Sequence, residues 1–200
     1  MLVRIFFIAA LAALTVPSPS GAETLSELLR TGKLEILSMS GNGSSSGAAL
    51  EGQVFNPTSA PLSVDVHLLE PIYFRNLGQA QNMIETRVYE ADGGYFVLGD
   101  RAFIEVPAGE VIEVLFVAYC ADFELDNPGR DSRFVMEAMP PELLDTARKV
   151  AAYEASRPDE DAMVALQLAV WLAQGVSPAR IERQFTFSPA DLSLARLILR

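Results

Sequence analysis

The sequence predicts an α+β protein: an N-terminal antiparallel β-sandwich of the immunoglobulin-like (Ig-like) type, followed by a small C-terminal helical subdomain. Between residues 33 and 139, short apolar segments are separated by turn-forming residues, and no helical periodicity lies between them. From residue 140 to residue 200, apolar residues recur at helical spacing instead. The sequence therefore divides into a leader (1–22), a β-sandwich (33–139) and a helical subdomain (140–200).

The leader, residues 1–22, is typical of a secretory signal peptide. Arg4 precedes an apolar stretch from Ile5 to Val16 that is too short to span a bilayer, and "SGA" supplies small residues before Glu23. No later stretch is apolar for long enough to be a transmembrane helix. We therefore expect an exported protein that is secreted, periplasmic or held at the cell surface, with no membrane span after the signal is cleaved.

The charge balance of the chain narrows its partners. The chain has 15 basic and 26 acidic residues, and loss of Arg4 with the leader lowers the basic count to 14, for a net charge of −12. Nucleic acids and anionic lipid surfaces are bound mainly through basic residues, so neither is an expected partner. A single cysteine, Cys120, excludes an internal disulfide, so the stability of the fold must come from packing.

After a short lead-in (23–32) that ends at Gly32, the strand predictions rest on alternating polarity. In "PLSVDVHLL", residues 61–69, every second residue from Leu62 to Leu68 is apolar, which is typical of a half-buried strand. The breaks between predicted strands hold turn-forming residues, as in "GNGSSSG", "NPTSAP", "ADGG" and "PAGE". The other predicted strands are 34–39, 48–55, 82–90, 94–98, 101–106, 111–120 and 133–138.

The helix predictions rest on starts and stops as well as on spacing. "PPELLDTARKVAAYEAS" (140–156) begins with proline, and the segment 159–175 begins with acidic residues and ends at Gly175. Ser177-Pro178 and Ser188-Pro189 each pair an N-cap residue with proline at the first helical position, so each predicts a further helix start.

Motifs for conventional chemistry are incomplete in this chain. "GSSSG" (43–47) fits a hydrolase pattern around Ser45, but no helix pattern follows it, so a hairpin loop is the better interpretation. "DFELDNPGRD" (122–131) departs from a calcium loop, with Asn127 where glycine is required. The only histidine, His67, lies on the polar face of a predicted strand. We therefore expect no enzyme in the usual sense, no metal site and no cofactor.

Two residues stand out against their apolar surroundings. Cys120 ends the most apolar predicted strand and shares a face with Ile112, Val114, Phe116 and Ala118, so it faces the core. Gln167 is the single polar residue in the middle of a helix that is apolar on nearly every side. A buried amide without a partner costs about 1–3 kcal/mol, so Gln167 needs either an ordinary partner, such as a backbone carbonyl or a water, or a chemical purpose.

The segments "AYC" (118–120) and "LQLAVW" (166–171) together resemble the Cys–Gln thioester domains of bacterial surface adhesins. That family joins a cysteine of a Y-C motif to the glutamine of a T-Q-x-A-[IV]-W motif; here Leu166 stands where the family usually has threonine. The resemblance implies that Cys120 supplies the thioester sulfur and Gln167 the acyl group, with Tyr119, Ala169 and Trp171 as motif neighbours. It also implies a β-part followed by a helical part.

The resemblance implies that the protein is an exported bacterial surface or periplasmic binding domain, which attaches to a partner's lysine through a single-use acyl transfer. A mature protein lighter by one ammonia, with no titratable thiol, would be its chemical signature. The alternative is a non-covalent β-sandwich module that binds a protein or a glycan, with "QAQNM" (79–83) and "DNPG" (126–129) as candidate contact loops. A third interpretation makes Cys120 an intermolecular disulfide partner, which its apolar strand face disfavours.

Overall fold

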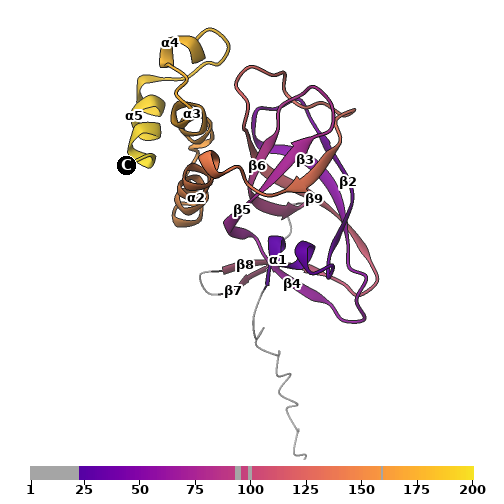
Figure 1. Ribbon diagram of the computed structural model, residues 1–200. Coiled ribbons are helices and arrows are strands. Elements are labelled where there is room, and N and C mark those ends of the chain that lie inside the picture. The colour runs from indigo at the N-terminus through magenta and orange to yellow at the C-terminus, as the bar shows by residue number, and fades with distance from the viewer. Residues whose placement is uncertain (1–22, 93–95, 99–100, 159) are drawn as a thin grey trace, which may run out of the picture.

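In a computed structural model, the structure describes residues 23–92, 96–98, 101–158 and 160–200, and the expected signal peptide lies outside them. Two β-sheets, a short helix near the N-terminus and a group of C-terminal helices make up the described part (Figure 1). This confirms a β-rich part followed by helices. The immunoglobulin-like arrangement of the strands stays a prediction.

The larger sheet has six strands in the order β10-β5-β6-β9-β3-β2, with every pair antiparallel. The smaller sheet has the order β1-β4-β8-β7, in which β1 pairs parallel to β4 and the other pairs are antiparallel. The strands are β1 (Glu23–Thr24), β2 (Glu35–Gly41), β3 (Ser46–Phe55), β4 (Leu62–Asp65), β5 (His67–Asn76), β6 (Met83–Glu90), β7 (Phe96–Leu98), β8 (Arg101–Val106), β9 (Val111–Cys120) and β10 (Phe134–Glu137).

The segment predicted as one strand around residues 62–68 is in fact divided between the two sheets. β4 pairs with β8 in the smaller sheet, whereas β5 begins at His67 and pairs with β6 in the larger one. At the corner, the Asp65 carboxylate accepts a hydrogen bond from the His67 N–H at 2.9 Å, and Val66 is buried. The alternation of apolar residues continues through this corner, which is why the single-strand prediction was wrong.

A short helix, α1 (Leu25–Arg30), lies where the sequence indicated only a lead-in. The Thr24 side chain caps it by accepting from the Glu27 N–H, and Gly32 follows it with a φ of 70°. Leu25 and Leu28 are buried, so this helix closes one end of the core. Six residues are too few for a helical period to be recognised in a sequence.

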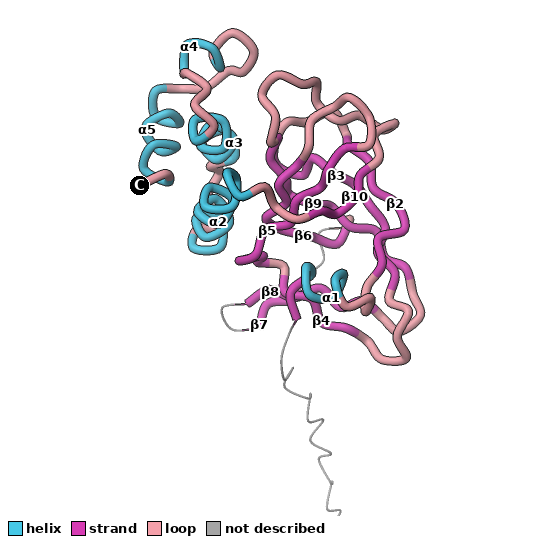
Figure 2. The backbone as a smooth tube through the Cα atoms, in the orientation of Figure 1, coloured by secondary structure: helices cyan, strands magenta, loops and turns pink. Residues whose placement is uncertain are grey.

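The C-terminal helices cover the outer face of the larger sheet on one side (Figure 2). They are α2 (Pro141–Ser156), α3 (Met163–Ala173), α4 (Pro178–Ile181) and α5 (Pro189–Ile198). α2 packs against β5 and β6, α3 packs against β9 and β3, and α5 packs against α3. The predicted start of α3 at residue 159 was too early, since residues 160–162 are not helical. Within the described part of the chain, no helix is long and apolar enough to cross a membrane.

Candidate functional site

Cys120 is the last residue of β9 and lies opposite Met83 of β6. The neighbouring Tyr119 points toward helix α2, so Cys120 points to the opposite, inner face of the sheet. Its side chain is fully buried, with the Sγ atom 3.7 Å from Met83 Sδ and 3.8 Å from Asn127 Oδ1. Burial raises the pKa of the thiol, with a further contribution from the charge of Asp122, so the thiol is neutral at physiological pH.

Gln167 lies in the middle of α3 and is fully buried. Its amide contacts the main chain of Cys120, 47 residues earlier. Gln167 Oε1 accepts a hydrogen bond from the Cys120 N–H at 2.8 Å, and Gln167 Nε2 donates to the Cys120 carbonyl at 2.9 Å. The structure therefore places the Gln167 amide against the main chain of Cys120, which gives the buried amide a partner at both ends, whereas the Cys120 thiol contacts Met83 and Asn127.

The register of β3 explains why an amide fits at this point. β3 begins at Ser46, opposite Tyr119, so the ladder between β3 and β9 ends next to Cys120. The Cys120 N–H also donates to the Ser45 carbonyl at 3.0 Å. Beyond this point β3 no longer pairs with β9, and the Gln167 amide provides the hydrogen-bond donor and acceptor that a further residue of β3 would provide to Cys120. Gln167 thus holds α3 to the end of β9.

The three motif neighbours occupy different positions around this contact. The Tyr119 hydroxyl donates to Glu154 of α2 at 2.7 Å, and burial raises the pKa of both side chains. Ala169 is fully buried. The Trp171 ring packs edge-on at 5.1 Å against Phe123, in the loop after Cys120, and at the same distance against Phe185. Trp171 therefore fixes the loop that follows the cysteine.

A pair of loops covers the thiol. Asn127, which is exposed, donates from Nδ2 to the Gly43 carbonyl at 3.0 Å while its Oδ1 atom contacts the Cys120 thiol. The two candidate contact loops, 79–83 and 126–129, touch each other here, because the Gln81 N–H donates to the Asp126 carbonyl at 3.0 Å. Gln81 Nε2 also donates to the Leu125 carbonyl at 2.7 Å.

The incomplete hydrolase and calcium-loop motifs lie in a turn and in a hydrogen-bonded loop. Ser45 lies in the turn between β2 and β3, with a strand and no helix after it. Asp122 accepts from the N–H and the Nδ2 group of Asn82, both at 2.8 Å. Among the residues that the structure describes, no group of three or more His, Cys, Asp or Glu side chains is placed to hold a metal ion.

His67 differs from the expected solvated surface histidine. It is only partly exposed, and its Nδ1 atom is buried with no hydrogen-bond partner among residues 23–92, 96–98, 101–158 and 160–200. Burial lowers the pKa of His67, and the nearby charge of Arg87, opposite it on β6, lowers that pKa further. His67 is therefore neutral at physiological pH, and it lies away from Cys120, since its partner Arg87 is four residues along β6 from Met83, the partner of Cys120.

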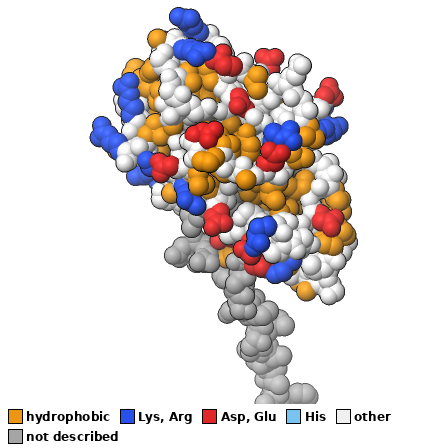
Figure 3. All heavy atoms as spheres, viewed as in Figure 1, with side chains coloured by type: hydrophobic (Ala, Val, Ile, Leu, Met, Phe, Trp, Pro, Cys, Tyr) orange, Lys and Arg blue, Asp and Glu red, His pale blue; other side chains and the backbone are white. Residues whose placement is uncertain are grey.

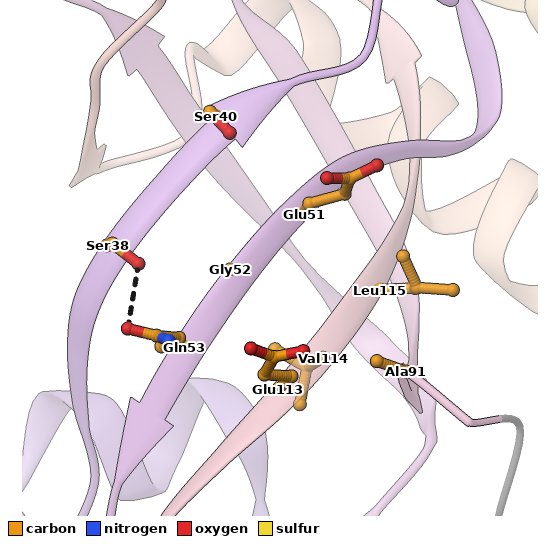
Figure 4. Close-up of a pocket in the computed structure, with 9 residues that line it drawn as sticks. All are labelled: Ser38, Ser40, Glu51, Gly52, Gln53, Ala91, Glu113, Val114 and Leu115. Carbon is orange, nitrogen blue, oxygen red and sulfur yellow. Dashed lines mark hydrogen bonds between the residues drawn. The ribbon is translucent and has the colours of Figure 1, made fainter. Parts of the chain in front are cut away.

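Two further features were not predicted from the sequence. Glu85 of β6 is fully buried, and neither of its carboxylate oxygens has a hydrogen-bond partner among the described residues. A groove of about 450 Å³ lies on the outer face of β2, β3 and β9 (Figure 4). We call it the sheet groove; it is lined by Ser38, Ser40, Glu51, Gly52, Gln53, Ala91, Glu113, Val114 and Leu115.

In comparisons with protein-family models, curated proteins and solved structures, the chain has no significant match to any of the three. The site must therefore be interpreted from its own geometry.

Proposed function

We propose that this chain is an exported bacterial binding domain, at the cell surface or in the periplasm, that attaches covalently to a partner amine through a Cys120–Gln167 thioester. The observation that carries the proposal is the contact of the Gln167 side-chain amide with the main chain of Cys120, both residues being fully buried. A thioester is an activated acyl group, and exclusion of water protects it from hydrolysis. The proposed β-part is an immunoglobulin-like sandwich, which two antiparallel-rich sheets support in outline.

The first step of the proposed chemistry forms the thioester. Cys120 Sγ attacks the Gln167 Cδ atom, an S–C bond forms, the Cδ–Nε2 bond breaks, and the thiol proton leaves with Nε2 as ammonia. The Cys120 N–H already donates to Gln167 Oε1 at 2.8 Å, so it is placed to stabilise negative charge that develops on this oxygen. The raised pKa of the thiol opposes formation of a free thiolate, so proton transfer must accompany the attack.

The second step consumes the thioester. An uncharged lysine amine of a partner attacks Cδ, an amide bond forms, and the S–C bond breaks. The amine proton passes to the sulfur, so Cys120 returns as a thiol. The result is one permanent cross-link per molecule without turnover.

Intact-mass measurement of the secreted, unreduced protein, with thiol titration after unfolding, tests the proposal. We expect a mass lower by one ammonia and no titratable thiol, and we expect Cys120→Ser and Gln167→Ala to restore the full mass. Gln174→Ala is the matched control, since Gln174 ends the same helix and donates only to the Val170 carbonyl. A wild-type protein of full mass with one free thiol would refute the thioester.

The alternative is a non-covalent module that binds a protein or a glycan. The observation that favours it is the complete pairing of the Gln167 amide with the Cys120 main chain, which is sufficient reason for a buried glutamine. In that case Gln167 has a structural role, and binding falls to a surface such as the sheet groove. The same mass measurement separates the two functions.

A further inference from the structure

We propose that the sheet groove docks an arginine- and lysine-rich segment of the partner protein and thereby delivers a lysine to Gln167. This inference rests on the proposed thioester function and names the partner chemistry for it. The groove crosses three neighbouring strands of the outer sheet face (Figure 4), and Glu51 and Glu113 within it are exposed. Ser38 and Ser40 come from β2, Glu51 and Gln53 from β3, and Glu113 and Leu115 from β9.

The charge of the groove selects a cationic occupant. Glu51 and Glu113 are exposed, neither has an ion pair among the described residues, and the described lining contains no Lys or Arg. The surrounding β-part is itself acidic, since residues 23–140 contain 18 acidic and 7 basic residues. The net negative charge of the β-part therefore attracts a basic segment at long range, and Glu51 and Glu113 attract it once it lies in the groove.

The direction of the strands connects the groove to the candidate thioester. Leu115 in the groove and Cys120 lie on the same strand, five residues apart, which corresponds to about 17 Å of extended chain. β3 runs beside β9 over the same interval, from Glu51 to Ser46, and the turn that precedes it meets Asn127 above the thiol. A partner segment that lies along the exposed part of these strands, with its basic residues in the groove, brings a lysine about five residues further on to the end of β9, where α3 packs and holds the buried Gln167.

Two acetylated peptides test this arrangement. The first carries four arginines, a five-residue Gly/Ser/Thr spacer and one lysine as its only amine; the second has four glutamines in place of the arginines. At low ionic strength we expect the arginine peptide to couple to the wild-type protein about tenfold faster than the glutamine peptide, with the advantage lost at high salt. A one-residue spacer is expected to remove the advantage as well.

The double variant Glu51→Gln/Glu113→Gln should remove the advantage of the arginine peptide. Glu105→Gln/Glu110→Gln is the matched control, because it makes the same charge change at exposed residues of β8 and the following turn. Equal coupling of the two peptides, or an undiminished advantage in the groove variant, would overturn the inference.

Methylamine separates this inference from the proposed function. Coupling of methylamine needs only the thioester, so a wild-type protein that does not couple methylamine refutes the proposed function directly. In that event, binding of the arginine peptide to Cys120→Ala, measured by calorimetry, still tests the groove. Weaker binding to the groove double variant on this background supports the groove, and unchanged binding rejects it.

Discussion

Glu85 is the residue whose burial is hardest to reconcile with its chemistry. Its carboxyl is fully buried and has no hydrogen-bond partner in the part of the chain that the structure describes, and burial raises its pKa well above the ordinary value. A buried carboxylate without a partner is costly, so the group stays protonated in the folded protein. In the unfolded chain the same group ionises at its ordinary pKa.

The sign of the resulting pH dependence follows from linkage. A raised pKa in the folded state means that the stabilising contribution is complete below the unfolded pKa of about 4.5 and is lost as the pH rises toward the folded value. We expect the free energy of unfolding to fall as the pH rises above the unfolded pKa of about 4.5. Glu85→Gln should flatten this dependence in urea titrations, and an unchanged slope would contradict the assignment.

Asn127 separates the buried thiol from solvent. Its side chain contacts Cys120 Sγ and holds the Gly43 carbonyl, although Asn127 itself is exposed. Asn127→Ala should therefore admit reagents to this position. If Cys120 is a free thiol, we expect its alkylation in the native state to become at least several-fold faster in Asn127→Ala. If Cys120 is in a thioester, we expect the hydrolysis of that thioester to become faster to the same extent. Asn42→Ala, in the facing turn, is the control and should change either rate less. Equal rates for Asn127→Ala and the wild type would show that access runs elsewhere.

At the scale of elements, the backbone at the end of β2 packs closely against the loop before β10. The Gly41 N–H donates to the Gly129 carbonyl at 3.1 Å, and a Cβ atom on Gly41 would lie 2.0 Å from the Pro128 carbonyl oxygen. Gly41→Ala must displace backbone and is expected to cost about 1–3 kcal/mol in thermal or urea unfolding. Gly129→Ala is the control, because a Cβ there meets nothing within 4 Å. Equal stability of the two variants would contradict this packing.

The elements also show what the sequence could and could not predict. Cys120 and Gln167 were expected to be buried because their neighbours along the chain are apolar at strand and helix spacing, and both are fully buried. Their contact could be expected only from the family resemblance. The corner at Val66 could not be predicted. Alternating polarity indicates which face of a sheet a side chain lies on, but it does not indicate which of the two sheets the strand belongs to.

The sheet groove and Glu85 were beyond prediction for a related reason. In β6 both faces are buried, one by the sheet interior and one by α2, so the polar residues of "MIETRVYE" gave no sign of their burial. The groove needs the register of three strands, β2, β3 and β9, and two of these pairings carry a bulge. Local patterns do not contain that register.

At the scale of the whole molecule, the β-part depends on the helices. Ile84, Thr86 and Tyr119 on the outer sheet face are buried in the intact chain, with Thr86 and Tyr119 both bound to Glu154 of α2. A fragment of residues 23–139 should therefore bind the dye ANS and unfold at a lower urea concentration than residues 23–200. A fragment that unfolds at the same urea concentration would show instead that the β-part is independently stable.

Charge is distributed unevenly between the β-part and the helical part. Seven of the basic residues lie between residues 141 and 200, where the numbers of basic and acidic residues are almost equal. Figure 3 shows Lys and Arg side chains gathered over the helical part. The β-part carries nearly all of the net negative charge. A bacterial envelope is itself anionic, so it repels the β-part more strongly than the helices. A molecule exported to such an envelope, as we propose, would turn its helical part toward the surface and its acidic β-part toward the surrounding medium.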